Sequence, residues 1–292
     1  MGNWTNNMKH FLIITNAFKD KNLKLTNEIK GYIEKKGGSC QCFTSTGDDT
    51  KHAAPEADAV APETECVLVL GGDGTLIRAA SKLVEQNMAL IGVNLGTLGY
   101  LCELEESNVA AVDELMEEHY TVEKRMMLCG YGIKQSEKTE CKVALNDIVI
   151  HRTGALSVVN LIVSVNGEYL NTFRADGIII STPTGSTGYN MSAGGPIVDP
   201  KASMILITPI NAHNLNSRSI VIGAEDEVMI EIGERRSQKD ETVEASFDGD
   251  NAVGLEVGDK FLIRKADSTT RICKLNNMSF LEILRKKMEA YT

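Results

Sequence analysis

The stretch from Cys66 to Glu85, CVLVLGGDGTLIRAASKLVE, constrains the fold more than any other part of the chain. Five apolar residues, Cys66 to Leu70, predict a buried strand, and the glycine-rich turn GGDGT follows it directly. The apolar spacing after Gly74-Thr75 predicts a helix. A strand that passes through glycines into a helix presents free backbone N–H groups, which a phosphate can approach closely. The sequence therefore predicts an anion site at this turn.

Asp73 lies in the middle of the same turn. A carboxylate repels phosphates, so its presence there requires either a metal or a role in proton transfer. The alternative is that Asp73 caps the helix or stabilises the turn, because aspartate is common at both places. The turn alone leaves these interpretations open.

The composition limits the class of protein. At 292 residues the chain is long enough for two domains, and its 42% hydrophobic and 24% charged residues are ordinary for a globular protein. The net charge of −10 argues against a general nucleic-acid binder, which needs a basic face. A few local cations can still attract a nucleotide into a cleft. We therefore expect no nucleic-acid partner but do not exclude a nucleotide ligand.

The N-terminal residues and the cysteines indicate where the protein works. The polar segment MGNWTNNMKH leads into FLIITN, which is too short to span a bilayer, so we expect neither a signal peptide nor membrane association. The seven cysteines are an odd number, and the close pair Cys40 and Cys42 lacks the second pair that a zinc site needs. These features predict reduced thiols in a cytoplasmic protein.

Strand and helix patterns alternate through the first third of the chain. The expected strands are His10–Thr15, Ser39–Thr44, Cys66–Leu70 and Ala89–Val93, with a helix at Leu23–Lys36 and a loop at Thr46–Thr64. This alternation predicts a parallel sheet with helices on both faces, in which ligands bind beyond the carboxyl ends of the strands. GGDGT follows one strand and NLGTLGYL (Asn94–Leu101) follows the next, so both lie at that edge.

From Thr121 to Lys265 the pattern changes to short β-rich runs separated by turn sequences such as Asn166-Gly167 and Asp248-Gly249. The expected strands are Lys142–Ile150, Val158–Val165, Gly177–Ser181, Met204–Thr208, Ile220–Ile222, Glu227–Ile232, Thr242–Phe247 and Lys260–Arg264. An amphipathic helix at Ser279–Ala290 should dock on another element.

These patterns predict two domains and a closing helix. We expect an α/β, Rossmann-like N-terminal domain over residues 1–120 and a β-rich domain over residues 121–276. The C-terminal helix occupies residues 277–292.

Two further segments carry polar groups in functional arrangements. The run RADGIIISTPTGSTGYNMSAGGPIVDP (Arg174–Pro200) is dense in hydroxyls and free amides, which suit a polyol or phosphate ligand. Such runs also form simple loops, but Arg174, Asp176 and Tyr189 within it favour binding. Residues Leu145–Asp147 (LND) could grip the two hydroxyls of a ribose or form a turn.

Taken in order, GGDGT, LND and DGIIISTPTGSTGYNMSAGGP resemble the motifs of the NAD kinase family, of the ATP-dependent bacterial type. The resemblance extends through ITPINAHNLNSRSIVI, SFDGD and SFLEILRKKM, and so covers most of Phe11–Met288. GGDGT alone is shared with lipid kinases of the diacylglycerol and sphingosine type and, as GGDGS, with phosphofructokinases. The Gly/Ser/Thr run is the more specific signal.

The resemblance implies transfer of the γ-phosphoryl of ATP to the 2′-hydroxyl of the adenosine ribose of NAD, giving NADP. Asp73 would be the general base for that hydroxyl. Mg²⁺ or another divalent cation would arrive with ATP, and no metal-ligating residues are assigned. The phosphate-facing turn would consist of Gly72, Gly74 and Thr75, with Arg78 adding positive charge one helical turn later.

The resemblance also assigns the contacts to NAD. Asn146 and Asp147 would hold the ribose hydroxyls, and Tyr100 could stack on adenine. Residues around the adenine and ribose would be Thr187, Gly188, Tyr189, Asn190 and Ser192, and those toward the rest of NAD would be Arg174 and, on the nicotinamide side, Asp176. The nicotinamide-side contacts would come from a neighbouring subunit of a homodimer or homotetramer.

Two positions depart from the family pattern. Gly188 stands where alanine is usual, and Asp250 stands where many bacterial members have glutamine, so no binding role is assigned to Asp250. Asp147 in place of glutamate is within the variation of the family. Two other functions remain open: a GGDGT-type lipid kinase, which would need an apolar entry for an acyl chain, and a non-catalytic NAD-binding sensor, which would gain nothing from Asp73.

Overall fold

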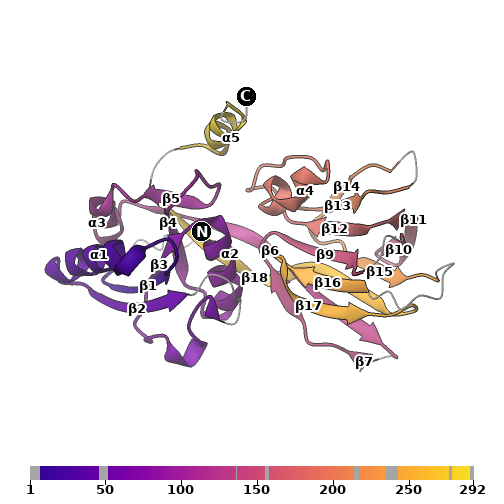
Figure 1. The fold of residues 1–292 in the computed structure, drawn as a ribbon, viewed down its shortest axis with the longest axis horizontal. Helices are drawn as coiled ribbons and strands as arrows, with labels where there is room; N and C mark the ends of the chain where they lie inside the picture. The colour runs from indigo at the N-terminus through magenta and orange to yellow at the C-terminus, as the bar shows by residue number, and fades with distance from the viewer. Residues whose placement is uncertain are drawn as a thin grey trace. The chain divides into compact units, whose positions relative to one another are not determined.

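The structure is a computed structural model that describes residues 7–45, 52–135, 137–154, 158–213, 217–234, 243–275 and 278–289. The chain forms two compact units, one of Met1–Arg125 with Ser268–Thr292 and one of Met126–Asp267. Figure 1 draws the first in indigo to purple with its C-terminal part in yellow, and the second mainly in pink to orange. Strand β18 (Lys260–Lys274) contributes residues to both.

The first unit contains a parallel sheet. Its strands follow the order β4-β3-β1-β2, and the end of β18 and the short strand β5 both pair with β4. The strands are β1 (His10–Asn16), β2 (Ser39–Ser45), β3 (Cys66–Gly71), β4 (Ala89–Asn94) and β5 (Cys102–Glu105). The prediction of a parallel α/β sheet is confirmed.

Helices cover both faces of this sheet because the side chains of each strand alternate between the faces. Leu25, Ile29 and Ile33 recur every four residues along α1 (Lys24–Lys35) and are buried with α3 (Val112–Met116) against one face. Helix α2 (Asp73–Lys82) lies on the other face, where Leu76 contacts the backbone at Gly92. Short 3₁₀ turns are η1 (Lys21–Leu23), η3 (Ala57–Ala59), η4 (Val84–Gln86) and η5 (Val109–Ala111).

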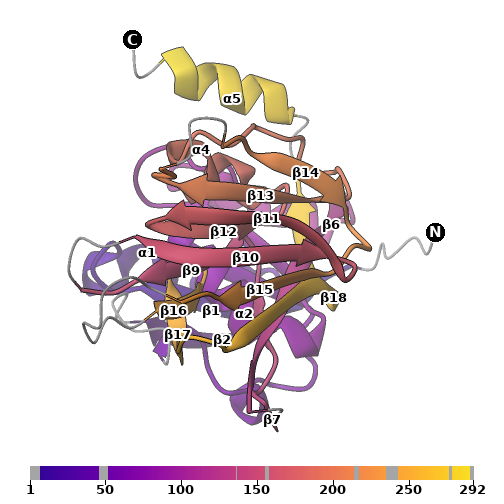
Figure 2. The same cartoon turned by 90° about the vertical axis from the view of Figure 1, so that its right-hand side faces the viewer.

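The second unit is built from antiparallel strands in two sheets (Figures 1 and 2). One sheet has the order β14-β13-β12-β9-β16-β17, and the other includes β11-β10-β15-β18 and β6 with β7 and β8. The strands are β6 (Thr121–Lys134), β7 (Glu137–Lys138), β8 (Lys142–Ala144), β9 (Asp147–Arg152), β10 (Val159–Val165), β11 (Glu168–Ala175), β12 (Gly177–Ser181), β13 (Met204–Ile210), β14 (Ile220–Gly223), β15 (Val228–Ile232), β16 (Val243–Phe247) and β17 (Asp250–Leu255).

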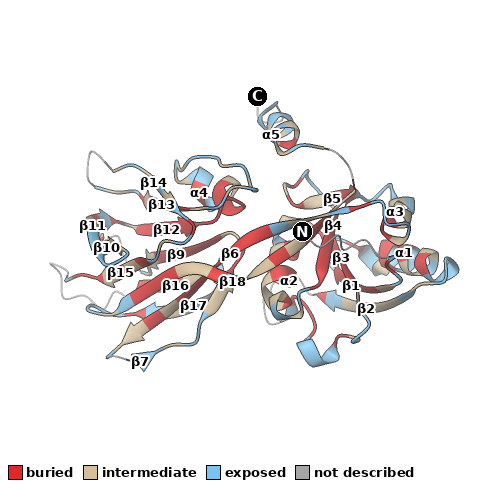
Figure 3. Cartoon of the chain, turned by 180° about the vertical axis from the view of Figure 1, so that it is seen from behind, coloured by how far each residue is buried: buried red, intermediate tan, exposed pale blue. Residues whose placement is uncertain are grey.

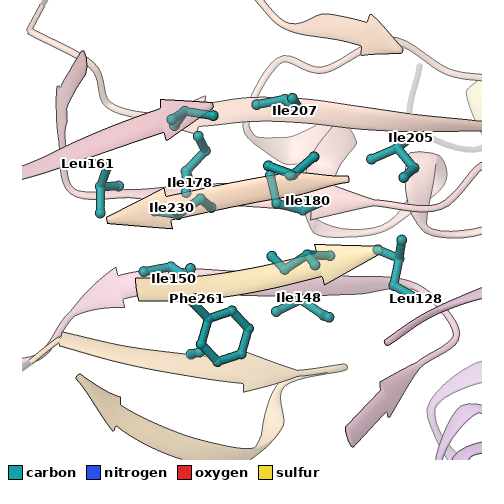
Figure 4. Close-up of a cluster of buried hydrophobic side chains, with 14 of the residues drawn as sticks. Leu128, Ile148, Ile150, Leu161, Ile178, Ile180, Ile205, Ile207, Ile230 and Phe261 are labelled. Atoms are coloured by element: carbon teal, nitrogen blue, oxygen red, sulfur yellow. The ribbon is translucent and has the colours of Figure 1, made fainter. Parts of the chain in front are cut away.

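The core of the second unit lies between these sheets. In Figure 4, Ile148, Ile150, Ile178 and Ile180 from the six-stranded sheet lie in one cluster with Leu161, Ile230 and Phe261 from the other sheet. The intervening Val149 and Ile179 pack on the opposite face with Ile210 and Ala193. The central strands are therefore continuously apolar because both of their faces are covered, and in Figure 3 β12 is buried whereas β7 is exposed.

The C-terminal helix α5 (Phe280–Glu289) forms where the sequence predicts it, with Ala290 outside the described residues. Its Phe280 ring lies 6.2 Å from the Tyr100 ring, measured between centroids. None of the helices in the described part of the chain is long and apolar enough to cross a membrane. The β-rich C-terminal region and the closing helix are thus both confirmed.

Several expectations need correction. The sequence patterns missed β5, β6, β7, β11 and β17, and the run Lys142–Ile150 is split at Leu145-Asn146. Cys129 and Cys141 form a disulfide, because Cys129 on β6 faces the start of β8 across an antiparallel pair. The expectation of reduced thiols is therefore wrong for these two, while the other five cysteines are free. Residues 46–51 of the predicted loop lie outside the described residues.

Candidate functional site

The GGDGT turn connects a buried strand to a helix, as the sequence predicts. All six residues of β3 are buried, and Gly72 has an extended backbone immediately before α2. The helix begins at Asp73, slightly earlier than the expected Gly74-Thr75. The N–H groups of this first helical turn point out of the carboxyl edge of the sheet, where they can meet an anion.

The carboxylate of Asp73 is held by the neighbouring loop. Its Oδ2 accepts the backbone N–H of Tyr100 at 2.7 Å, and its Oδ1 accepts that of Leu101 at 3.1 Å. The side chain makes no capping bond to its own helix, so the interpretation of Asp73 as a simple cap is wrong. The NLGTLGYL loop thus fixes the direction in which this carboxylate points.

Gly99 makes this close approach possible. A Cβ atom at residue 99 would collide with Oδ1 of Asp73. Only glycine lets the loop backbone come near enough for the two N–H bonds to the carboxylate. Gly99 in the NLGTLGYL loop is therefore required for the contact with Asp73 in the GGDGT turn.

A cavity of about 230 Å³ lies at this turn. Four of the residues that line it were assigned from the motif, besides Asp73 itself: Gly72, Gly74, Thr75 and Arg78. Lys19 and Lys287 also line it, although no binding role was assigned to them from the sequence. Tyr100 does not line the cavity, but its N–H holds Asp73, and Nζ of Lys287 lies 4.5 Å from its ring centroid.

A second, larger cavity of about 870 Å³ lies in the second unit. Among the residues assigned from the sequence it is lined by Asn146, Asp147, Asp176 and Tyr189. Other polar residues of the lining were not assigned as binding residues: His151, Arg152, Asn211, Glu244, Ser246, Asp248 and Asp250. The lining is rich in carboxylates, which are hydrogen-bond acceptors for hydroxyl groups.

Asp248 organises the LND segment. Its carboxylate accepts the backbone N–H groups of Leu145 at 2.8 Å, Asn146 at 2.7 Å and Asp147 at 3.2 Å. Asp248 itself sits in a tight turn between β16 and β17, where it and Gly249 have φ values of 51° and 83°. The sequence indicated only this Asp-Gly turn, and nothing in it showed that the side chain reaches residues a hundred positions away.

Asp147 has an unusual electrostatic environment. Its side chain is 5% exposed, and burial together with the nearby charge of Asp248 raises its pKa from 3.8 to about 7. Near neutral pH Asp147 therefore exists in both the protonated and the ionised form. A carboxyl group in this state can donate or accept a hydrogen bond to a ligand hydroxyl.

Asp176 is held at the other end of the cavity lining. Nε of Arg152 donates to Oδ1 of Asp176 at 2.8 Å, and Nδ2 of Asn211 donates to Oδ2 at 2.9 Å. These bonds lower the pKa of Asp176, with the bond from Arg152 as the largest cause. Asp176 is therefore a fixed anion, in contrast to Asp147.

The Gly/Ser/Thr run begins by packing against the LND segment. The N–H of Thr182 donates to the Asn146 carbonyl at 2.8 Å, and the Thr182 hydroxyl donates to the Leu145 carbonyl at 2.7 Å. A Cβ at Gly185, in the turn η6 (Gly185–Thr187), would collide with the Asn146 carbonyl. The structure thus brings together two segments that the sequence suggested as partners.

Some assigned residues lie away from the cavity. Asn190, on α4 (Tyr189–Ser192), is fully buried, and its amide bonds to the carbonyls of Ser186 and Pro196 and to the Thr208 hydroxyl. Its side chain thus holds the loop of the Gly/Ser/Thr run in place. The remaining assigned residues outside the cavity lining are Arg174, Thr187, Gly188 and Ser192.

Both parts of the chain match known protein families. Residues 11–120 match the model of the ATP-NAD kinase N-terminal domain, and residues 145–275 match that of the ATP-NAD kinase C-terminal domain. The chain belongs to the ATP-NAD kinase family. It is 56% identical over 286 residues to an NAD kinase of Agathobacter rectalis, covering 98% of this chain and all of that protein. It is 42% identical to an NAD kinase of Lachnospira eligens, covering 96% of this chain and all of that protein.

Solved structures of this family share the fold. Yeast NADH kinase complexed with NADH superposes with a TM-score of 0.85 at 23% identity, covering 98% of this chain and 89% of that one. An NAD kinase from Archaeoglobus fulgidus in complex with ATP superposes with a TM-score of 0.77 at 20% identity, covering 96% and 99%. The two cavities thus lie in the two parts of a family fold, one in each compact unit.

A resident metal is a separate question from the nucleotide. In the ranges that the structure describes, no three or more His, Cys, Asp or Glu side chains are grouped to hold a metal ion. Mg²⁺ is commonly bound by one or two carboxylates together with substrate phosphates, so a single carboxylate such as Asp73 beside a phosphate site fits that mode.

Proposed function

We propose that the chain transfers the γ-phosphoryl of ATP to the 2′-hydroxyl of the adenosine ribose of NAD, producing NADP. The observation that carries this proposal is the pair of cavities, each inside a matched family domain. One surrounds Asp73 with cations and glycine backbone, and the other offers carboxylates and amides. The first suits phosphates and the second suits the hydroxyls of a ribose.

On the donor side, the N–H group of Gly74 and the guanidinium of Arg78 bind phosphate oxygens, and Thr75 completes the turn that faces them. Asp73 accepts the proton of the attacking hydroxyl. Each of its oxygens accepts one backbone N–H, and the carboxylate also accepts a hydrogen bond from the Cys102 thiol, which leaves it acceptor capacity for the proton. As the 2′-oxygen forms its bond to the γ-phosphorus, the bond from that phosphorus to the bridging oxygen breaks, and ADP leaves.

On the acceptor side, Asn146 and Asp147 hold the ribose hydroxyls and orient the 2′-oxygen. Their backbone is fixed by Asp248, so the grip is in place before the substrate binds. Tyr189, which is half exposed at the cavity, provides an aromatic face for adenine. Asp176 addresses the nicotinamide side and Arg174 contacts NAD as well, while the side chain of Asn190 holds the loop that surrounds adenine and ribose.

A divalent cation accompanies ATP in this proposal. Asp73 and the phosphates would hold it, and bound there it would neutralise charge on the transferring phosphoryl group. The five free cysteines support a cytoplasmic location. We keep the functional division into residues 1–120, 121–276 and 277–292 as part of the proposal.

The test is a direct assay for product. Purified protein is incubated with ATP, Mg²⁺ and NAD, and NADP is measured at catalytic protein concentrations. Parallel reactions with NADH, with polyphosphate and with diacylglycerol define the acceptor and the donor. Formation of NADP excludes the sensor, and a phosphorylated lipid without NADP would overturn the proposal.

We also propose that the protein is a homo-oligomer whose active sites combine residues of two subunits. Its support is the family resemblance and the placement of Asp73 and Asp176 in different compact units. Inactive Asp73→Asn and Asp176→Ala chains are mixed under conditions that exchange subunits. Composite sites regain activity, because some mixed dimers contain one site with both aspartates. No recovered activity after confirmed exchange would contradict shared sites and leave the kinase proposal untouched.

A further inference from the structure

Two lysines to which the sequence assigned no binding role line the cavity around Asp73. Lys19 follows β1, and Lys287 lies on α5, so they come from opposite ends of the chain. We infer that Lys19 and Lys287 bind the phosphate groups of the donor nucleotide from two sides of the GGDGT turn. This inference rests on the proposed function, because it names further residues of the same donor site.

The backbone around Lys19 is firmly held although its side chain is exposed. The N–H groups of Lys19 and Asp20 both donate to the Asn16 carbonyl at 3.0 Å. The buried Asp20 carboxylate accepts the N–H groups of Leu25 at 3.0 Å and Thr26 at 2.9 Å at the start of α1. Because the backbone of Lys19 and of Asp20 is fixed, the side chain of Lys19 leaves the sheet edge in a defined direction.

That direction is across the carboxyl ends of the central strands. Nζ of Lys19 lies 3.0 Å from the position of a Cβ on Gly72 and 3.7 Å from that of a Cβ on Gly96. It thus spans from the end of β1 to the backbone after β3 and β4. Within the described ranges no ion pair or side-chain hydrogen bond engages its ammonium group. A cation held over glycine backbone in this way can accept a phosphate.

Lys287 reaches the same cavity from the C-terminal helix. Its Nζ lies 4.5 Å above the Tyr100 ring, and that ring also contacts Phe280 on the same helix. The N–H of Tyr100 donates to Asp73 at 2.7 Å. Tyr100 therefore connects helix α5, which carries Lys287, to the carboxylate of Asp73.

The basic residues next to Lys287 have other partners. Nζ of Lys286 lies 3.3 Å from Glu282, and Nε of Arg285 lies 4.0 Å from Glu289, each on the same helix. Lys287 is the one of these three that lines the cavity. Lys286 is consequently a matched control, since it has the same charge and the adjacent position.

Charge and size agree with a phosphate site. The ionised side chains that line the cavity are Lys19, Arg78, Lys287 and Asp73, with a net charge of +2. This is a local reversal of the net charge of −10 on the chain. A volume of about 230 Å³ is below that of sites for whole drug-sized ligands, and it suits a phosphate chain without its nucleoside.

The test compares Lys19→Met and Lys287→Met with Lys24→Met and Lys286→Met. Lys24 is a matched control for Lys19. It lies on the same loop-helix segment and lines a neighbouring cavity, but it does not line the cavity around Asp73. Methionine keeps the length and the apolar stem of lysine. Binding of ATP, of inorganic tripolyphosphate and of NAD to each protein is measured by isothermal titration calorimetry, and turnover is measured in parallel.

Each of the two test variants should bind ATP and tripolyphosphate roughly ten- to a hundredfold more weakly than wild type, the range for a hydrogen bond to a charged group. Binding of NAD and both control variants should stay within about twofold of wild type. Lys→Arg at either position should restore most of the affinity for tripolyphosphate, because it restores the charge. A general defect in folding would not be rescued in this way and would weaken NAD binding as well.

Unchanged affinity for tripolyphosphate in either test variant would overturn the role of that lysine. Weaker binding of ATP without weaker binding of tripolyphosphate would also overturn it, since the contact would then be to the nucleoside. These outcomes leave NADP formation by the wild-type protein unaffected. If the wild type formed no NADP, the proposed function would fail, and the tripolyphosphate measurements would still decide the inference.

Discussion

Asp73 in the first unit and Asp147 in the second differ in how their carboxyl groups are supported. Asp73 receives two backbone N–H groups and shares its cavity with three cations. Asp147 is buried beside a second carboxylate, and its pKa rises to about 7. The same side chain is thus held by backbone N–H groups beside cations in one region, whereas in the other its pKa is raised by burial and by a second carboxylate.

The rest of each cavity follows the same division. The first cavity is lined by the cations Lys19, Arg78 and Lys287. The second cavity is lined by five carboxylates and by the guanidinium of Arg152. Phosphates require cations and backbone N–H groups, and sugar hydroxyls require acceptors. In the proposed function the two regions therefore divide recognition of the two substrates, although both depend on an aspartate fixed by a loop.

The largest expected effect concerns the base. Asp73→Asn should lower kcat by roughly two to four orders of magnitude while NAD binds nearly as before, because the amide cannot accept the hydroxyl proton. Steady-state kinetics and calorimetric titration with NAD measure the two quantities. A variant that keeps more than about a tenth of wild-type kcat would show that the first cavity does not contain the base.

Gly99→Ala should have the next largest effect on the rate. The added Cβ collides with Oδ1 of Asp73, so the carboxylate must move, and a displacement of about 1 Å in a catalytic group can cost on the order of a hundredfold in rate. Gly96→Ala is the matched control, because its Cβ would lie 3.7 Å from Lys19 and fits without displacement. Equal kcat in the two variants would mean that the loop does not position Asp73.

Asp248→Asn tests the second region. The amide has one acceptor oxygen for three N–H groups, so we expect a loss of about 1.5–3 kcal/mol in kcat/KM for NAD with little change in KM for ATP. The removed charge should also lower the pKa of Asp147, which shifts the pH profile toward acid. Asp259→Asn, in another turn of the same unit, is the control. A general loss for both substrates without the pH shift would refute a positioning role.

Most of the fold could be predicted from local patterns. The strands β3, β4 and β12 are continuously apolar, so periodicity found them, and glycine turns marked their ends. The long β6 was missed because charged residues interrupt its first half, at Glu123 to Arg125, where Arg125 is buried in an ion pair with Glu123. A buried ion pair hides an internal strand from any pattern based on hydropathy.

The site could be predicted only where its residues form contiguous motifs. Asp73, Asn146 and Asp147 belong to such motifs and line the two cavities. Lys19, Lys287 and Asp248 reach them through long-range packing, and no local spacing encodes that. Asn190 is the opposite case. It lies inside a predicted binding motif, but the hydrogen bonds of its side chain go to Ser186, Pro196 and Thr208 and stabilise the loop.

The last expected effect is on stability rather than on rate and comes from the raised pKa of Asp147. Below about pH 4 this group is protonated in the folded and the unfolded chain, and between pH 4 and 7 only the folded chain keeps the proton. Ionisation therefore favours unfolding in this window, by on the order of 1 kcal/mol per pH unit, and the penalty is constant above pH 7. Urea unfolding should show wild-type stability falling relative to Asp147→Asn from pH 4 to 7.

The opposite behaviour of Asp176 supplies the control for that measurement. Its pKa is lowered by Arg152, so it is ionised in both states above pH 5, and Asp176→Asn should show no slope relative to wild type between pH 5 and 7. Its contribution is lost only as the pH falls below the ordinary value of 3.8. If Asp147→Asn also gave a flat difference, the proton would not be held at Asp147, and the two regions would support their aspartates in the same way.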